Sequence, residues 1–290
     1  MRFSAVIVNY ESWPHTLRCV KALQDTGHGS LEVLVVDNGQ EEPPDLPTSV
    51  RMIRNPENAG FARACNQGIT ASHGDGVVLI NPDTLVEGDF FDTLEKFLSD
   101  NPKAGIAGPR IVDGCGVLQL SARREMSFLS GLLGRTSFLT RLFPESAVVK
   151  RMFPATDGFS GPTKVDWVSG ACMAVRRETL EAVDGLDERF FMYFEDTDLC
   201  RRSREAGWPV YYLPQVEVLH LTGASSSKLR AIWLLHKSAF LYHRKHGRHG
   251  PLGLYDVTVF LGLCARGLVK LVASLPLSPA DRHLRRLSKG

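Results

Sequence analysis

The segment VVLINPDT (residues 77–84) decides the fold class, because an apolar run is followed at once by the polar residues Asn81 and Asp83. Two earlier apolar runs end in the same way, at Asn9 and at Asp37. Helix-period segments separate these runs, and the alternation predicts a parallel sheet covered by helices. Since the carboxyl ends of parallel strands share one edge of a sheet, we expect the polar side chains there to line a ligand site.

The other apolar runs and periodicities predict the remaining elements. We expect strands at residues 3–9, 31–36, 50–55, 77–80, 104–108, 210–213 and 216–221, and ordered structure again at residues 165–175. We expect helices at residues 14–24, 62–72, 90–98, 197–206, 231–243 and 252–273. Residues 124–164 have weak periodicity and several Gly, Pro and Ser residues, so we expect a long excursion that covers the active site.

Composition fits a folded globular protein. The chain has 290 residues, of which 43% are hydrophobic and 23% are charged, and this is too apolar for a disordered chain. Six cysteines lie far apart without a CxxC pair, so we expect reduced thiols and neither a disulfide framework nor a zinc site. A strand-like run stands where a signal peptide would lie, which predicts a cytoplasmic protein.

Charge is distributed unevenly along the chain. Lys and Arg number 22 against 30 Asp and Glu in residues 1–227, but 12 against 2 in residues 228–290, a net charge of +10. A basic segment of this kind favours anionic surfaces. We therefore expect peripheral contact with the inner face of the plasma membrane. We expect no nucleic-acid partner.

The helix expected at residues 252–273 is amphipathic. Asp256, Arg266 and Lys270 fall on one side of it and leave the remainder strongly apolar. These charges interrupt the run before it reaches the ~20 apolar residues that span a bilayer. An interfacial helix and a helix that packs a homodimer both stay open as interpretations.

Asp83 is a candidate ligand of a divalent cation. It follows the run at residues 77–80, where a carboxylate can hold Mg²⁺ or Mn²⁺ against a diphosphate. These ions need only one or two protein oxygens, because phosphates and water complete the octahedron. His220, at the end of the run VEVLH, is a candidate second ligand. The alternatives are an ordinary Asn-Pro-Asp turn and a structural histidine.

Three carboxylates, Glu195, Asp196 and Asp198, follow a group of aromatic residues in FFMYFEDTDLCRR (residues 190–202). Burial beside aromatic side chains raises the pKa of a carboxyl group and suits it to remove a proton from a substrate hydroxyl. We expect the general base to be one of the pair Glu195 and Asp196. The alternative is that these residues occupy the first turn of a helix, where the dipole favours acidic side chains.

Three further signals are individually weak. Gly60, in NAGFARACNQG (residues 58–68), precedes a helix whose first amides can face an anion. Asp37 can accept the N3–H of a uracil or thymine ring, or cap the loop that follows it. Trp167, in WVSGACMAV, can stack on a sugar ring or lie in the core.

Taken in order, the motifs VIVNYES, VVDNG, NAGFARACNQG, NPDT, WVSGACMAVRR, GLDERFFMYFEDTDLCRR and HLTGAS resemble glycosyltransferase family 2, in particular its rhamnosyltransferase-like branch. The resemblance covers roughly residues 3–225. It implies the α/β GT-A fold, a Rossmann-like mixed sheet flanked by helices, here with a C-terminal helical extension. It also implies inverting transfer of a sugar, rhamnose or another deoxyhexose, from a dTDP- or UDP-linked donor to a saccharide or lipid-linked saccharide in bacterial surface polysaccharide synthesis.

The implied organisation is a catalytic domain followed by an extension. The GT-A domain takes residues 1–227, with a nucleotide-sugar-binding half at 1–110 and an acceptor half at 165–227. The basic, amphipathic helical extension takes residues 228–290.

The resemblance and the strand-edge pattern together assign the site residues. The catalytic pair is Asp196, as the base, with Glu195, and the metal ligands are Asp83 and His220. The donor-binding residues are Asn9, Tyr10, Asp37, Asn58, Gly60, Arg63, Asn66 and Asn81, with Asp37 recognising the nucleobase. The acceptor-binding residues are Trp167, Gly170 and Ala171. The chain departs from the Asp-x-Asp or Asp-Asp of many relatives, because Asn81 and Pro82 precede a single Asp83; we expect weaker metal binding, or sharing with His220.

Two other functions are open to the same fold. A sugar-phosphate nucleotidylyltransferase usually carries a Gly-rich, basic loop near its first strand, which VNYESWPHT lacks. A non-catalytic nucleotide-sugar-binding module is the other, since fold does not fix function. The presence of Asp83, Glu195 and Asp196 argues against a module without catalysis.

Overall fold

A computed structural model describes residues 1–119, 121–123, 159–221, 228–247 and 253–274. The chain divides into two compact units, Met1–Ser225 and Ser226–Gly290. The first unit is an α/β domain and the second is a helical hairpin.

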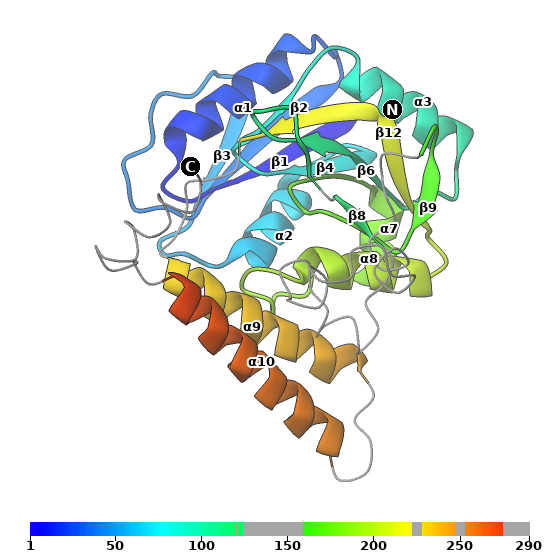
Figure 1. Cartoon of the computed structure of the whole chain (residues 1–290). Helices are drawn as coiled ribbons and strands as arrows, with labels where there is room; N and C mark the ends of the chain where they lie inside the picture. Colours follow the sequence, from blue (N-terminus) through cyan, green and yellow to red (C-terminus); the bar gives the residue numbers. More distant parts are fainter. Residues whose placement is uncertain (120, 124–158, 222–227, 248–252, 275–290) are drawn as a thin grey trace, which may run out of the picture. The chain divides into compact units, whose positions relative to one another are not determined.

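Four parallel strands form the first half of the sheet (Figure 1): β1 (Phe3–Asn9), β2 (Leu31–Asp37), β3 (Val50–Arg54) and β4 (Gly76–Ile80), in the order β3-β2-β1-β4. Asn9 of β1 lies in register with Asp37 of β2. The predicted convergence of these strand ends at one edge is therefore confirmed.

The second half of the sheet is mixed. β11 (Cys172–Arg176) runs antiparallel between β4 and β6 (Ile106–Val112). β12 (Val210–His220) is parallel to β6, and β5 (Thr84–Val86) pairs antiparallel with β12. The short strands are β7 (Leu118–Gln119) on β6, β9 (Thr163–Val165) on β12, and a separate pair of β8 (Ala122–Arg123) with β10 (Trp167–Val168).

Helices cover both faces of this sheet (Figure 1). Those on one face are α1 (Trp13–Asp25) and α3 (Phe90–Asp100), and those on the other are α2 (Phe61–Ala71), α7 (Arg177–Val183) and α8 (Glu195–Glu205). Strand β1 is buried along its whole length, because Phe3 and Ile7 pack into the core on one face while Val6 and Val8 pack on the other. The predicted fold, a mixed sheet between helices, is confirmed.

Several expected boundaries were wrong. The ordered stretch expected at residues 165–175 holds the end of β9, then β10 and β11, with a turn at 169–171 between the last two. The two strands expected at 210–213 and 216–221 are the single strand β12, with an irregularity between Leu213 and Glu217. Most of the expected excursion, residues 124–158, lies outside the described residues.

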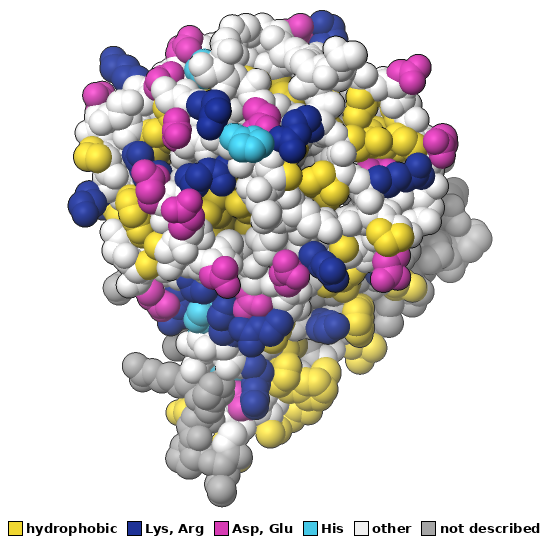
Figure 2. All heavy atoms as spheres, turned by 180° about the vertical axis from the view of Figure 1, so that it is seen from behind, with side chains coloured by type: hydrophobic (Ala, Val, Ile, Leu, Met, Phe, Trp, Pro, Cys, Tyr) yellow, Lys and Arg dark blue, Asp and Glu magenta, His cyan; other side chains and the backbone are white. Residues whose placement is uncertain are grey.

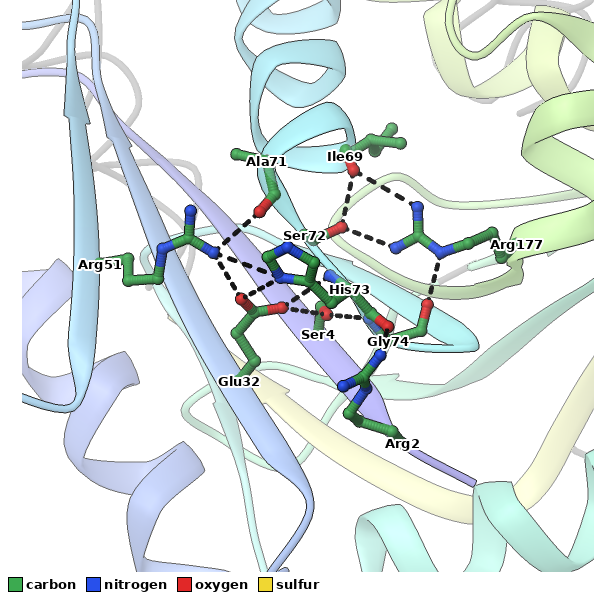
Figure 3. Close-up of polar contacts among 10 residues, drawn as sticks. All are labelled: Arg2, Ser4, Glu32, Arg51, Ile69, Ala71, Ser72, His73, Gly74 and Arg177. Atoms are coloured by element: carbon green, nitrogen blue, oxygen red, sulfur yellow. Dashed lines mark hydrogen bonds and ion pairs between the residues drawn. The ribbon is translucent and has the colours of Figure 1, made fainter.

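A polar network ties together the amino-terminal ends of the parallel strands (Figure 3). Glu32, on β2, accepts hydrogen bonds from Ser4 Oγ at 2.7 Å, a guanidinium nitrogen of Arg51 at 2.6 Å and the His73 amide at 2.9 Å. Burial alone would raise the pKa of Glu32, but these bonds lower it to about 2. Arg177 holds the same loop from α7, through the carbonyl of the residue after His73. This network occupies the amino-terminal end of the sheet, so the candidate site is sought at the carboxyl ends of the strands.

The second unit is an antiparallel pair of helices, α9 (Lys228–His246) and α10 (Leu254–Ser274). Phe240 and Phe260 pack edge to face with ring centroids 5.6 Å apart, and Gly267 lies against His236. Among the helices that the structure describes, none combines the length and the apolarity that a membrane crossing requires.

Candidate active site

Asn9 fixes the position of Asp37 at the strand edge. Both side chains are fully buried, and Asn9 Nδ2 donates to Asp37 Oδ1 at 2.8 Å. Asn9 Oδ1 accepts the hydroxyls of Ser12 at 3.0 Å and Thr16 at 2.8 Å, so both ends of its amide are engaged by protein. Asn9 therefore orients Asp37. Tyr10, the next residue, is half-buried at the same edge.

Asp37 keeps one oxygen available. Its Oδ1 accepts the Gly39 amide at 3.0 Å, which is the loop-capping contact that the sequence allowed. Its Oδ2 is buried and accepts no hydrogen bond from the described residues, although Arg54 Nε forms an ion pair with it at 3.6 Å. An acceptor buried without a hydrogen bond costs free energy, and a bound ligand is one of the partners that would satisfy it.

A cluster of amide side chains lies beside Asp37, and the sequence motifs did not indicate it. Asn55 donates to Asn38 Oδ1 at 2.7 Å and exchanges two bonds of 2.8 Å with Gln67. Asn38 in turn donates to the Gly60 carbonyl at 3.1 Å. The cluster joins the end of β2 to the start of α2.

The start of α2 is built on the segment before α8. Gly60 has φ +88°, and a Cβ there would lie 2.9 Å from the Phe191 carbonyl oxygen, so glycine is required. Asn58 Oδ1 accepts the Gly60 amide at 3.0 Å, and the Phe61 amide donates to the Phe191 carbonyl at 2.7 Å. One amide that an anion was expected to contact is therefore used by the protein itself.

Asn66 holds the loop between α7 and α8. Its Oδ1 accepts the Leu186 amide at 2.9 Å, and its Nδ2 donates to the Leu186 carbonyl at 2.8 Å. Arg63, one turn earlier on α2, is 61% exposed and forms an ion pair with Glu188 at 4.0 Å. The structure thus gives Asn66 a positioning contact and leaves Arg63 extended toward solvent.

Asp83 and His220 come together at the edge where β5 pairs with β12. Asp83 Oδ1 lies 3.2 Å from His220 Nε2, and the residue after Asp83 is in register with His220. Gln119, on β7, donates from Nε2 to the His220 carbonyl at 3.2 Å, and its Oε1 lies 2.9 Å from His220 Nδ1. Since the Gln119 oxygen can only accept, this contact orients the ring with Nδ1 toward Gln119 and Nε2 toward Asp83.

The turn at residues 169–171 connects this edge with α8. The Ala171 carbonyl accepts the Asn81 amide at 2.9 Å and the Thr84 hydroxyl at 3.2 Å, on either side of Asp83. The Gly170 amide donates to Asp196 Oδ2 at 2.9 Å. One short turn therefore fixes the backbone around Asp83 and the carboxylate of Asp196.

Asp196 is held at both oxygens. In addition to the Gly170 contact, its Oδ1 accepts the Thr197 amide at 2.6 Å and the Thr197 hydroxyl at 3.2 Å. Burial raises the pKa of Asp196, and these bonds partly offset the increase. The buried indole N–H of Trp167 has no partner within hydrogen-bond distance among the described residues. It nevertheless lies close enough to Asp196 to lower the pKa of that carboxyl group.

Glu195 is more deeply buried, with 6% of its surface exposed, and its Oε2 has no hydrogen-bond partner in the described part of the chain. Burial, and then the charge of Asp196, raise the pKa of Glu195 well above its ordinary value, as the aromatic flank predicts. Tyr193 and Phe194 precede it in left-handed backbone, with φ of 70° and 69°. Such strain in non-glycine residues is typical of functional sites.

Asp198 has a different environment from the other two carboxylates. It is fully buried on α8 and pairs with Arg202 at 2.6 Å, one turn along the same helix. Arg202 also donates to the Val183 carbonyl at 2.5 Å, which fastens α8 to α7. The third acidic residue of the motif thus has a structural partner.

Residues 1–234 match the model of a family described as glycosyltransferase like family 2. The chain is 32% identical over 261 residues to N-acetylglucosaminyl-diphospho-decaprenol L-rhamnosyltransferase of Mycobacterium tuberculosis, covering 82% of each chain. It is 25% identical to dTDP-rhamnosyl transferase RfbF of Shigella flexneri, covering 97% of this chain and 92% of the relative.

Two solved structures share the fold. The mannosyltransferase PcManGT of Pyrobaculum calidifontis, in complex with GDP-Man and Mn²⁺, has a TM-score of 0.55 at 17% identity over 99% of this chain and 79% of its own. GalNAc-T7 with UDP, GalNAc and Mn²⁺ has a TM-score of 0.56 at 14% identity, and this chain spans about half, 54%, of its length. Both are glycosyltransferases with the GT-A fold, and the nucleotidylyltransferase alternative is not supported. The chain belongs to glycosyltransferase family 2 and is a glycosyltransferase.

Proposed function

We propose that this enzyme transfers rhamnose, or another deoxyhexose, with inversion from a dTDP-linked donor to a lipid-linked saccharide during synthesis of a bacterial surface polysaccharide. The names of the relatives from Mycobacterium tuberculosis and Shigella flexneri support this choice of sugar, and the first of these names supports the lipid-linked acceptor. A UDP-linked donor is the alternative.

The turn at residues 169–171 carries the proposal. Its carbonyl at Ala171 braces the backbone around Asp83, and its amide at Gly170 holds Asp196 Oδ2 at 2.9 Å. A group that binds donor phosphates and a group that removes a proton are therefore held by adjacent residues. Orientation of two reactants in this way is a large part of catalysis.

Asp83 and His220 are the proposed ligands of a divalent cation, Mg²⁺ or Mn²⁺. Neighbouring ligands of an octahedral ion at about 2.1 Å lie roughly 3 Å apart, and Asp83 Oδ1 and His220 Nε2 are 3.2 Å apart. The described residues hold no group of three or more His, Cys, Asp or Glu that could bind a metal, so these two ligands suit an ion completed by diphosphate and water. When bound, the ion would stabilise the charge that develops on the leaving diphosphate.

Asp196 is the proposed general base. Burial raises the pKa of both carboxyl groups, but the hydrogen bonds from Gly170 and Thr197 favour the charged form of Asp196, whereas the charge of Asp196 further disfavours the charged form of Glu195. The Asp196 carboxylate removes the proton from the acceptor hydroxyl as that oxygen attacks the anomeric carbon from the face opposite the diphosphate. Trp167 and the amides of the 169–171 turn border the acceptor.

The donor is proposed to lie over the carboxyl ends of β1, β2 and β4. Asp37 Oδ2, which accepts no hydrogen bond from the described residues, would accept the N3–H of thymine or uracil. Tyr10, Asn58, Gly60, Arg63 and Asn81 lie at or beside this edge, whereas Asn9 and Asn66 act by positioning Asp37 and the α7–α8 loop.

The proposed setting is the cytoplasmic face of the plasma membrane, because a lipid-linked acceptor is embedded in a bilayer. A homodimer is the other arrangement that the C-terminal helices would support.

The test is transfer of labelled sugar from dTDP-rhamnose to a polyprenyl-diphospho-N-acetylglucosamine acceptor, with Mn²⁺ present and absent. We expect a metal-dependent product and release of dTDP. Release of pyrophosphate from a sugar phosphate and a nucleoside triphosphate, or donor binding without turnover, would contradict the proposal. A thermal-shift screen of dTDP-, UDP- and GDP-sugars identifies the donor, since a ligand bound only to the folded state raises the melting temperature.

A further inference from the structure

We propose that the outward face of α10 is a membrane-contact surface that binds bilayers with anionic headgroups. The inference rests on the proposed function in one respect, since a lipid-linked acceptor brings the enzyme to a bilayer. It deepens that function by assigning the contact to particular side chains of the second unit.

A buried acidic side chain of α10 lies against the basic end of α9. Asp256 of α10 is only 8% exposed, and it contacts His243 of α9 at 2.9 Å and Arg244 of α9 at 2.8 Å. Arg266 lies on the same side of α10 and is not among its exposed residues. Charged groups thus take part in the contact between the helices beside the Phe240–Phe260 pair, while other apolar side chains of α10 face outward.

The outward side of α10 is apolar over four turns. Its exposed large side chains include Leu254 (62%), Val257 (56%), Leu261 (60%) and Leu268 (61%), spaced so that they fall on one face of the helix. Thr258 lies on the same face, but its hydroxyl already donates to the Leu254 carbonyl at 2.9 Å. The exposed residues of α10 among positions 254–268 include no Lys, Arg, Asp or Glu.

This concentration of apolar surface is confined to one unit. Ten large hydrophobic side chains are exposed in the described part of the chain, and eight of them lie in α9 and α10. The first unit contributes only Met52 and Val117. Figure 2 shows the difference as a broad yellow area on the helical hairpin, with dark blue basic side chains beside it. Patches of this kind mark interaction sites.

Charge selects a bilayer as the occupant. Residues 228–290 carry 12 Lys and Arg against 2 Asp and Glu, so two copies of this segment would repel each other. Anionic headgroups neutralise the same charge while the apolar face enters the acyl boundary. Trp233 of α9, 60% exposed with Lys237 over its ring at 5.0 Å, has the amphipathic character of an interfacial anchor. In the proposed contact the helix would lie in the plane of the surface, as an amphipathic helix with one apolar face does.

The test is sedimentation of the full-length chain with vesicles of phosphatidylglycerol and phosphatidylcholine in equal amounts. The variant is Leu261→Glu, and the matched control is Val117→Glu, which makes a similar change at a side chain of equal exposure, 59% against 60%, in the first unit. We expect the unchanged protein and Val117→Glu to sediment alike, and Leu261→Glu to bind about tenfold more weakly or less. Added salt, or vesicles of phosphatidylcholine alone, should weaken binding by all three proteins.

Equal binding by Leu261→Glu and Val117→Glu would overturn the proposal. The proposal would also be overturned if the unchanged protein did not bind vesicles. If Leu261→Glu then had a lower melting temperature, or lost a dimer in sedimentation velocity, the face would be assigned to a protein contact. Thermal-shift binding of dTDP-rhamnose, measured on the same proteins without vesicles, tests the proposed function separately. Donor binding without vesicle binding would leave the proposed function standing and reject the membrane surface.

Discussion

Replacement of Asp196 by Asn tests the proposed base most directly. The change keeps the size of the side chain and removes its ability to accept a proton. Both oxygens of Asp196 now accept backbone amides, from Gly170 at 2.9 Å and from Thr197 at 2.6 Å. An Asn side chain can accept only one of them, and its NH₂ group must face the other.

The structure therefore predicts two separate effects of this substitution, one on the free energy of unfolding and one on turnover. The amide left facing NH₂ costs about 1–3 kcal/mol of unfolding free energy, which is larger than the few tenths that an exchange of one helix-capping residue for another would cost. Loss of a general base lowers turnover by roughly 10²- to 10⁴-fold. Urea unfolding measures the first quantity, and turnover at saturating donor and acceptor measures the second.

Two companion variants make the result decisive. Asp184→Asn makes the same chemical change at the exposed, left-handed C-cap of α7, and turnover and stability should stay near those of the unchanged protein. Glu195→Gln replaces a side chain whose charged form is disfavoured by burial and by the neighbouring Asp196, so we expect a loss of turnover under about tenfold. Near-normal turnover in a folded Asp196→Asn protein, with a large loss in Glu195→Gln, would move the base to Glu195. Because burial raises the pKa of Asp196, turnover of the unchanged enzyme should begin to fall at a higher pH than an ordinary aspartate would set.

Three further predictions concern the metal site and the opposite end of the sheet. Asp83→Ala should abolish the Mn²⁺-dependent part of nucleotide affinity in calorimetry, because His220 alone would remain, and unchanged affinity would remove Asp83 from the site. Gln119→Leu should weaken Mn²⁺ binding about 10- to 100-fold, because His220 loses the partner that directs Nε2 toward Asp83. Gln119→Asn in the same titration keeps the amide on a shorter side chain and shows whether the length of the side chain is needed for this contact. Glu32→Gln should lower the unfolding free energy at pH 7. The lowering of the Glu32 pKa from 4.5 to about 2 corresponds to roughly 3 kcal/mol. Because Arg51 is half-exposed, screening by solvent reduces the expected loss to about 1–2 kcal/mol. That stability is fully present above pH 4.5 and is lost as pH falls through about 2, so urea unfolding that gives a constant difference between the two proteins across this range would contradict it.

Local sequence pattern predicted the first, parallel half of the sheet well. Apolar runs ending at Asn9, Asp37 and Asn81 gave three adjacent parallel strands with their polar ends at one edge, because strand length and period are local properties. The direction of β11 was not predictable in this way. A run such as 172–176 carries the same apolar signal whether it pairs parallel or antiparallel with β4.

The parts of the site that pattern missed depend on distant contacts. Gln119 lies 101 positions from His220, and Asn66 lies 120 positions from Leu186, so no local spacing links either pair. The start of α8 was expected two residues late, because Phe194 precedes it in a left-handed conformation that side-chain propensity does not predict outside glycine.

The turn at residues 169–171 also limits how this enzyme can be redesigned. A Cβ at position 170 in a loop grafted there to accept a new sugar would lie 3.2 Å from the Cβ of Asp196 and 3.3 Å from its Oδ2, so it would shift the Asp196 side chain by a few tenths of an ångström. The loop must also keep the Ala171 carbonyl in place for Asn81 and Thr84. With the proposed roles of Asp83 and Asp196, donor and acceptor preferences would therefore not be exchangeable independently of each other. A redesign would have to replace three contacting segments at the same time, namely residues 81–84, 167–172 and 194–198.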